Sequence, residues 1–147
     1  MIAVLQRVSS ASVAVDASGH RAEIPHGFVV LLCVERDDSP EAAMWMARKI
    51  AQLRVFADES GRFNRSITDV SGSVLLVSQF TLAGDCRKGN RPSFLSAADP
   101  VQAVELLEQV EQTLKDSFHL PVAVGEFQAK MTVSLVNEGP ATFILQR

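Results

Sequence analysis

Gly72-Ser73-Val74-Leu75-Leu76-Val77 is a compact apolar run that starts at a glycine, and it is the strongest indication of the fold in this sequence. A run of this length is typical of a strand buried on both faces, as in the middle of a layered α/β sheet. Polar residues follow directly, in Ser78-Gln79-Phe80-Thr81-Leu82. Sites in layered α/β proteins commonly lie where a buried strand opens into a loop, so this segment is the first candidate site.

Two other segments have the residue pattern of helices. One begins at Ser39-Pro40 and the other at Asp99-Pro100, and each continues with apolar residues at helical spacing. A serine or aspartate before a proline is typical of a helix cap and first helical position. Gln102 follows Asp99 by three residues, as in a capping box. The buried face of the second helix is predicted to comprise Ala103, Leu106, Leu107, Val110 and Leu114.

Strand-like runs occupy most of the remaining chain, and the last two are predicted to pair as a hairpin. They are Ile2–Val8, Ala11–Asp16, Phe28–Val34, Arg54–Ala57, Pro121–Val124, Met131–Val136 and Ala141–Gln146. Two helices among many strands predict an α/β fold, in one domain spanning 1–147, with mixed or antiparallel sheets and two main helices.

Composition narrows the class of function. The chain has 147 residues, 47% hydrophobic and 21% charged, which fits one globular domain. A net charge of −3 argues against a dedicated duplex-binding protein, although Arg87, Lys88 and Arg91 form a local basic cluster in a loop. No apolar run is long enough to span a membrane and no secretory leader is visible, so a cytoplasmic protein is expected.

The usual catalytic motifs are absent from the sequence. The three histidines, His20, His26 and His119, have no serine or cysteine in a nucleophile-like setting, and no metal-binding or phosphate-loop motif occurs. The polar groups of Ser78, Gln79 and Thr81, together with backbone N–H groups, remain. Such groups can stabilise an oxyanion during hydrolysis of an activated ester. The alternative is that Ser78 and Thr81 only cap backbone groups of a loop.

A second unusual segment is Asn137-Glu138-Gly139-Pro140-Ala141-Thr142. Strand connections favour Asn-Gly or Asp-Gly, whereas proline fixes its own φ and donates no backbone hydrogen bond. An ordinary turn is one explanation of this segment. A stiff segment that presents backbone carbonyls is the other.

Together these motifs resemble those of the D-aminoacyl-tRNA deacylases. The likeness includes Ser78–Leu82, Arg91-Pro92-Ser93-Phe94, the 137–142 hexapeptide, the start Ile2–Val8 and the segment Gly125–Met131, and it covers essentially the whole chain. One departure is Ala141, where the family more often has valine. The resemblance implies a three-layer α/β/β fold and hydrolysis of the ester that joins a D-amino acid to tRNA, with glycyl-tRNA as a further substrate. It also implies a homodimer without a metal or organic cofactor.

The resemblance, together with the chemistry and position of the residues, suggests a role for each candidate residue. Gly139 and Pro140, joined by a cis bond, would enter the partner subunit's site together with Asn137 and exclude L-amino acids. Backbone N–H groups around Gln79 and Phe80 would hold the oxyanion, and Thr81 ranks below direct attack by water as the nucleophile. The residues expected at the adenosine are Phe127, Ala129 and Met131, with a core role as an equal alternative for Met131. The residues expected at the tRNA backbone are Arg87, Lys88 and Arg91.

Two other functions remain open on the sequence. A non-catalytic RNA-binding module would use the basic cluster, but the net charge and the lack of aromatic residues interleaved with basic ones argue against it. Relatives with a trans Gly-Pro bond act on L-alanyl-tRNA, and the hexapeptide sequence distinguishes them only weakly.

Overall fold

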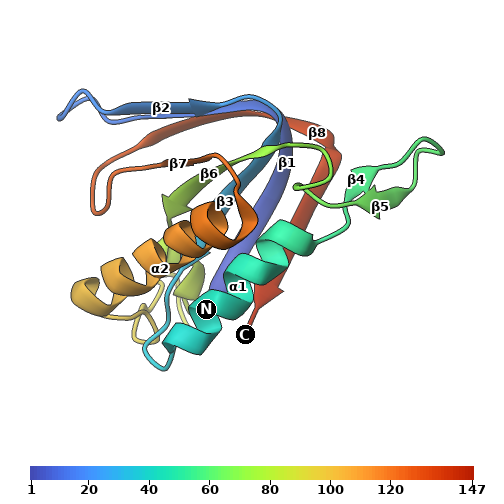
Figure 1. Cartoon of the computed structure of the whole chain (residues 1–147). Helices are drawn as coiled ribbons and strands as arrows, with labels where there is room; N and C mark the ends of the chain where they lie inside the picture. The colour runs from blue at the N-terminus through green and yellow to red at the C-terminus, as the bar shows by residue number, and fades with distance from the viewer.

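A mixed six-stranded sheet forms the centre of the protein, in a computed structural model that describes residues 1–147 (Figure 1). The elements are β1 (Ile2–Ala14), β2 (Arg21–Ile24), β3 (Gly27–Cys33), α1 (Pro40–Gln52), β4 (Phe56–Ala57), β5 (Phe63–Arg65), β6 (Ser73–Ser78), the 3-10 helix η1 (Phe80–Ala83), α2 (Pro100–Phe118), β7 (Val122–Val124) and β8 (Thr132–Gln146). The sheet order is β2-β1-β3-β6-β7, and β8 pairs with β1. β6 is parallel to β3 and β7, whereas the pairs made by β1 are antiparallel.

Three layers result from the alternation of side chains along β3 and β6. Phe28, Val30 and Leu76 point toward the two helices and belong to the larger core. Val29 and Leu75 point the other way, into a second core beneath β2, the distal half of β1 and the first half of β8. The predicted α/β fold with two main helices and three layers is confirmed.

The predicted hairpin of Met131–Val136 and Ala141–Gln146 is wrong. Both runs belong to one strand, β8, and pair side by side with β1 rather than with each other. The predicted strands Ile2–Val8 and Ala11–Asp16 are likewise one strand, β1. A continuous β1 supplies a partner along the whole of β8, so the Gly-Pro step interrupts a ladder instead of reversing the chain.

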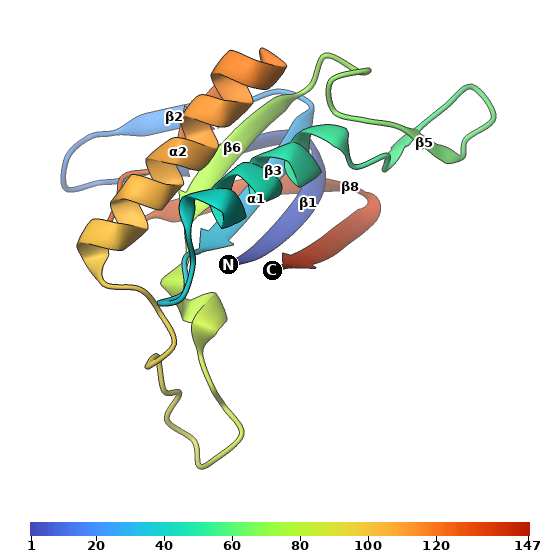
Figure 2. The same ribbon diagram turned by 60° about the horizontal axis from the view of Figure 1, so that its bottom comes forward.

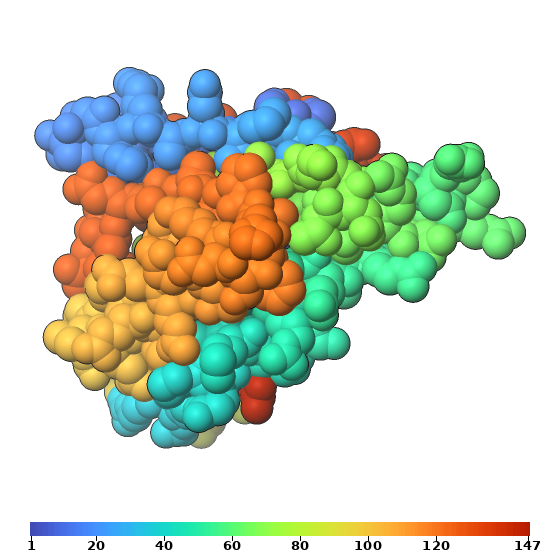
Figure 3. All heavy atoms as spheres, in the orientation of Figure 1, coloured from blue at the N-terminus to red at the C-terminus, as the bar shows by residue number.

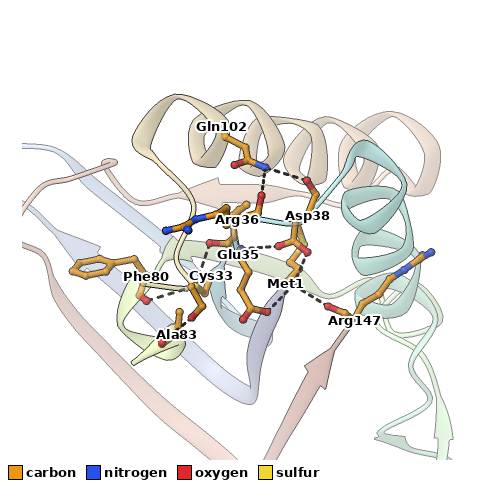
Figure 4. Close-up of polar contacts among 11 residues, drawn as sticks. Met1, Cys33, Glu35, Arg36, Asp38, Phe80, Ala83, Gln102 and Arg147 are labelled. Carbon is orange, nitrogen blue, oxygen red and sulfur yellow. Dashed lines mark hydrogen bonds and ion pairs between the residues drawn. The ribbon is translucent and has the colours of Figure 1, made fainter. Parts of the chain in front are cut away.

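Both predicted helices are confirmed, but only the second has the predicted side-chain cap: Ser39 occupies the cap position of α1, yet its side chain makes no capping hydrogen bond. The Asp99 carboxylate accepts hydrogen bonds from the backbone N–H groups of Val101 and Gln102, at 3.0 and 3.2 Å. The Gln102 side chain does not complete a capping box, because it donates instead to the carbonyls of Arg36 and Asp38 at 3.1 and 3.0 Å (Figure 4). The start of α2 is thereby attached to the loop that follows β3.

Two segments project from this body, namely the β4–β5 hairpin and the long loop between η1 and α2 (Figure 2). The loop carries the basic cluster and is closed by paired bonds between Asp85 and Ser93, of 2.8 and 3.0 Å. No helix combines the length and the apolar character needed to cross a membrane.

Candidate active site

A cleft of about 770 Å³ opens at the carboxyl end of β6. Its walls come from β6 and η1, from the first half of α2, and from the segment after β7. The space-filling view shows the hollow between α2 and that segment (Figure 3). The predicted residues that line it are Ser78, Gln79, Phe80, Phe127, Ala129 and Met131. The structure therefore gathers the predicted catalytic and adenosine-binding segments, except Thr81, around one largely apolar cavity.

Met131 lies at the boundary between the second core and the cleft. It is half-buried and packs against the second core, and it also lines the cleft. Gly125 lies close to Met131: a Cβ added to Gly125 would be only 2.6 Å from the Met131 Sδ. The two ends of the segment after β7 therefore lie in close contact at this wall of the cleft.

Two backbone N–H groups are free at the end of β6. Phe80 and Thr81 open the 3-10 helix, whose first internal bond runs from the Leu82 N–H to the Gln79 carbonyl at 3.2 Å. The N–H groups of Phe80 and Thr81 therefore precede the internal donors and have no acceptor. The Phe80 ring is 59% exposed and contacts the Phe94 ring edge-on, with 5.1 Å between the centroids.

The expectation that the Gln79 N–H belongs to the oxyanion donors does not fit this geometry. That group donates to the Leu32 carbonyl at 2.8 Å, because it continues the parallel ladder between β3 and β6 by one residue. The available donors lie one and two residues later, at Phe80 and Thr81.

The Thr81 hydroxyl lies beside the cleft without a base. Its oxygen accepts a hydrogen bond from the Gln79 side-chain amide, which cannot remove a proton. None of the three histidines lines the cleft. His20 contacts the Val124 carbonyl, His26 contacts the Phe56 ring, and His119 lies at the end of α2. The geometry therefore provides no activation for a threonine nucleophile.

Cys33 lies beside the turn and contacts it through its side chain (Figure 4). The Cys33 Sγ lies 3.5 Å from the carbonyl of Phe80, to which it donates. Burial raises the pKa of the Cys33 thiol, so the group stays neutral at physiological pH.

In the same close-up, the Met1 ammonium contacts the carboxylates of Glu35 and Asp38 at 3.0 and 2.6 Å, which attaches β1 to the loop after β3.

Gly139 and Pro140 do not lie in this cleft. Across the sheet, Ser78 pairs with Leu32, Leu32 pairs with Ala3, and Ala3 pairs with Leu145. The Gly-Pro step lies further along β8, beside Arg7 of β1. Three strand spacings and about four residues along β1 separate the two positions, which corresponds to roughly 20 Å. One chain therefore does not bring the two predicted halves of the site together.

The Gly-Pro step is an interruption in the β1–β8 ladder. Asn137 pairs with Val8 and Thr142 pairs with Gln6, so residues 138–141 have no ladder partner. The Gly139–Pro140 bond is cis and both residues are exposed. Asn137 closes the interruption, because its Oδ1 accepts a hydrogen bond from the Ala141 N–H at 2.9 Å.

Arg7 is a residue of this segment that the motifs did not reveal. It is 8% exposed, and its guanidinium donates to the carbonyls of Glu138 at 3.1 Å and Val55 at 2.5 Å. Its Cζ atom also lies 5.2 Å from the centre of the Phe63 ring. A signal exists in the sequence, since Ala3, Leu5 and Arg7 alternate on one face of a strand and place a charge in line with core residues.

The members of the basic cluster differ from one another. Arg87 forms a two-point ion pair with Asp85, with Nη2 to Oδ2 at 2.7 Å and Nε to Oδ1 at 2.9 Å. The hydrogen bond from Arg87 lowers the pKa of Asp85 to about 2. Lys88 and Arg91 are exposed and form no ion pair. The free positive charge of this loop therefore comes from Lys88 and Arg91.

Comparisons with known proteins place this chain in the class of the tRNA deacylases, which are hydrolases of ester bonds. A family model described as D-Tyr-tRNA(Tyr) deacylase matches residues 4–146. The chain therefore belongs to the D-Tyr-tRNA(Tyr) deacylase family, as the resemblance implied.

Individual relatives agree over their full length. The chain is 54% identical to a D-aminoacyl-tRNA deacylase of Desulforudis audaxviator, covering 99% of this chain and 96% of the relative. It is 52% identical to one of Pelobacter propionicus, with complete coverage of both.

Solved structures extend the comparison. A protein named c-Myc DNA Unwinding Element Binding Protein superposes with a TM-score of 0.91 at 38% identity, covering 100% of this chain and 99% of the other. A structure titled as a probable eukaryotic D-amino acid tRNA deacylase superposes with a TM-score of 0.84, covering 98% of this chain and 97% of the other. At 15% identity, this second match shows the fold alone.

Proposed function

We propose that the protein hydrolyses the ester bond of D-aminoacyl-tRNA and releases tRNA and the free D-amino acid. The observation that carries this proposal is the pair of free N–H groups of Phe80 and Thr81 beside an apolar cleft, in a chain of this family. One domain, 1–147, carries the activity, and it acts in the cytoplasm, where translation uses tRNA.

The cleft holds the terminal adenosine of the tRNA. Its volume of about 770 Å³ lies within the range of small-molecule pockets. Phe127 offers an aromatic face to the base, and Ala129 and Met131 complete that wall. The ester at the ribose then lies near Ser78 and the start of η1.

Hydrolysis needs little beyond stabilisation of charge, because the ester is already activated. Water attacks the ester carbonyl, and the resulting oxyanion accepts hydrogen bonds from the N–H groups of Phe80 and Thr81. The neighbouring hydroxyl of the terminal ribose assists the water. The bond from the carbonyl carbon to the ribose oxygen then breaks, and that oxygen takes the proton that the water loses.

A second subunit supplies the selection of chirality. Gly139 and Pro140 are exposed and roughly 20 Å from the turn of their own chain, by the strand spacing above. On β8, the apolar residues Val136 and Ile144 flank the step and are 58% and 70% exposed, which suits an interface. In a homodimer, the Gly139 and Pro140 carbonyls accept hydrogen bonds from the substrate ammonium. They fill the space that an L side chain needs, so D-aminoacyl and glycyl esters are accepted.

A deacylation assay tests the activity. We expect cleavage of D-tyrosyl-tRNA and glycyl-tRNA and no cleavage of L-tyrosyl-tRNA. Cleavage of the L-ester would instead indicate the activity of the trans-type relatives. Absence of all cleavage, with retained RNA binding, would indicate a binding module.

Mixed dimers test the contribution of the second subunit. Phe80→Pro removes one of the two oxyanion N–H groups, so its homodimer is expected to be nearly inactive, whereas the Gly139→Ala homodimer is expected to cleave D-esters with weaker discrimination against L-esters. A mixed dimer of the two variants contains one intact site and is expected to show wild-type discrimination at up to half the activity of a wild-type dimer. Weak discrimination in confirmed mixed dimers would show that both halves of a site come from the same chain.

A further inference from the structure

A second cavity, of about 200 Å³, opens beside the cleft, between α2 and the end of β7. Ser78, Leu107 and Phe127 line both cavities, so these side chains form the boundary between them. An RNA end that places its last base in the large cleft can therefore place the preceding base in the small cavity. Its size suits a single pyrimidine rather than a longer segment.

The small cavity has the walls of a base pocket. Phe127 contributes an aromatic face, and Leu76 and Val124 contribute apolar surface. Proteins bind splayed bases of single-stranded RNA by stacking them on aromatic rings and by hydrogen bonds to the base edges. No lysine or arginine lines this cavity. A base edge therefore fits it better than a phosphate group does.

Glu108 supplies the group that distinguishes among bases. Glu111, the other carboxylate of the cavity, forms an ion pair with Lys115 at 2.5 Å, whereas Glu108 is exposed and forms no ion pair. An ionised carboxylate only accepts hydrogen bonds. The amino group of cytosine is the base-edge donor that acidic side chains recognise, whereas uracil has a carbonyl oxygen at that place.

We propose that this cavity binds the base of the nucleotide before the terminal adenosine, a cytosine in tRNA, and that Glu108 recognises its amino group. This inference rests on the proposed deacylase function. It makes Glu108 a specificity-determining residue outside the catalytic turn.

Chemically acylated RNA minihelices test the inference. The substrates are two D-tyrosyl minihelices that end in CCA or CUA, and D-tyrosyl-adenosine, which lacks the preceding nucleotide. For the wild type we expect kcat/KM to be about tenfold higher for CCA than for CUA, within the range of one good base contact. For Glu108→Gln we expect a ratio near one, with the hydrolysis of D-tyrosyl-adenosine unchanged.

Glu105→Gln is the matched control. Glu105 is an exposed carboxylate of the same helix that does not line the cavity, so this variant should keep the tenfold ratio. A wild-type ratio of one, or a tenfold ratio that survives in Glu108→Gln, would overturn the inference while leaving the deacylase function intact. An altered preference among D-amino acids in Glu108→Gln, without a change in the CCA to CUA ratio, would show that the cavity takes the amino-acid side chain instead. Inactivity of the wild type on all three substrates would overturn the proposed function itself.

Discussion

The Gly139–Pro140 step and the Ser78–Thr81 turn both lie where a strand ladder stops, but the protein holds them differently. Around the Gly-Pro step, the Glu138 carbonyl accepts from Arg7 and the Ala141 N–H donates to Asn137. In the turn, one N–H is bonded to the Leu32 carbonyl and the next two are free.

The two segments therefore differ in what they can do: the Gly-Pro step has a fixed shape, and the turn has free hydrogen-bond donors. A segment whose polar groups are bonded to its own chain keeps one shape, which suits a surface that excludes one enantiomer. A turn with free donors stabilises charge that appears only during reaction. Substitutions around the Gly-Pro step should therefore reduce both stability and activity, whereas substitutions in the turn should change the rate alone.

Arg7→Ala is expected to have the largest effect. It leaves the carbonyls of Val55 and Glu138 without their donor in a largely buried site, so the free energy of unfolding should fall by about 3 kcal/mol. Urea denaturation measures this loss, and the deacylation assay should show a parallel loss of activity. Arg7→Lys keeps the charge but lacks the planar fork, so we expect an intermediate loss. Wild-type stability of Arg7→Ala would show that the step does not depend on this side chain.

Gly139→Ala should come next. Gly139 has a φ of +129°, and an added Cβ would lie 2.9 Å from the Arg7 Nη2. We expect a loss of about 1–2 kcal/mol in unfolding free energy and weaker discrimination against L-esters. Gly61→Ala is the matched control, because Gly61 also has a positive φ, +79°, but has open space around it. Equal effects of both variants on discrimination would mean that crowding at the step is irrelevant.

The local parts of the fold could be predicted from the sequence. The helix starts at Pro40 and Pro100 depend on residues next to them, and the burial of β6 follows from its own composition. The partner of β8 could not be predicted this way. It depends on the continuity of β1 through the exposed residues Ser9 and Ser10, where the register shifts.

The candidate site could likewise be predicted from the sequence only in part. The cleft gathers the polar turn after β6 with the segment Phe127–Met131, which motif order and strand ends could suggest. The hydrogen bond from the Gln79 N–H to the Leu32 carbonyl depends on the register between β3 and β6. That register is set by contacts among residues far apart in sequence, so short motifs do not contain it.

Substitutions in the loop after η1 should have a smaller effect, and this effect should be on tRNA binding rather than on the structure of the protein. Lys88→Ala with Arg91→Ala should weaken tRNA binding several-fold and reduce the salt dependence of binding by about two phosphate contacts. Arg87→Ala should change the affinity less, because Asp85 already neutralises Arg87. Filter binding over a range of salt concentrations measures both quantities. A larger effect from Arg87→Ala would mean that the ion pair opens on binding.

Thr81→Ala should change the rate less than threefold, because no base activates the hydroxyl and the backbone N–H remains. Single-turnover deacylation provides the measurement. A near-total loss of activity with a trapped acyl-threonine in the wild type would instead establish a covalent route.

The pH dependence of the Asp85–Arg87 pair gives the smallest effect. The folded-state pKa of Asp85 is about 2, below its ordinary value of 3.8, so the pair is complete above about pH 4 and is lost as the pH falls toward 2. An NMR titration of the Asp85 carboxyl measures this pKa, and Arg87→Ala should return it toward 3.8. Asp85→Asn removes a negative charge and frees Arg87, so at neutral pH it should strengthen tRNA binding. Unchanged affinity in Asp85→Asn would show that Arg87 does not contact the phosphates even when it is freed from its ion pair.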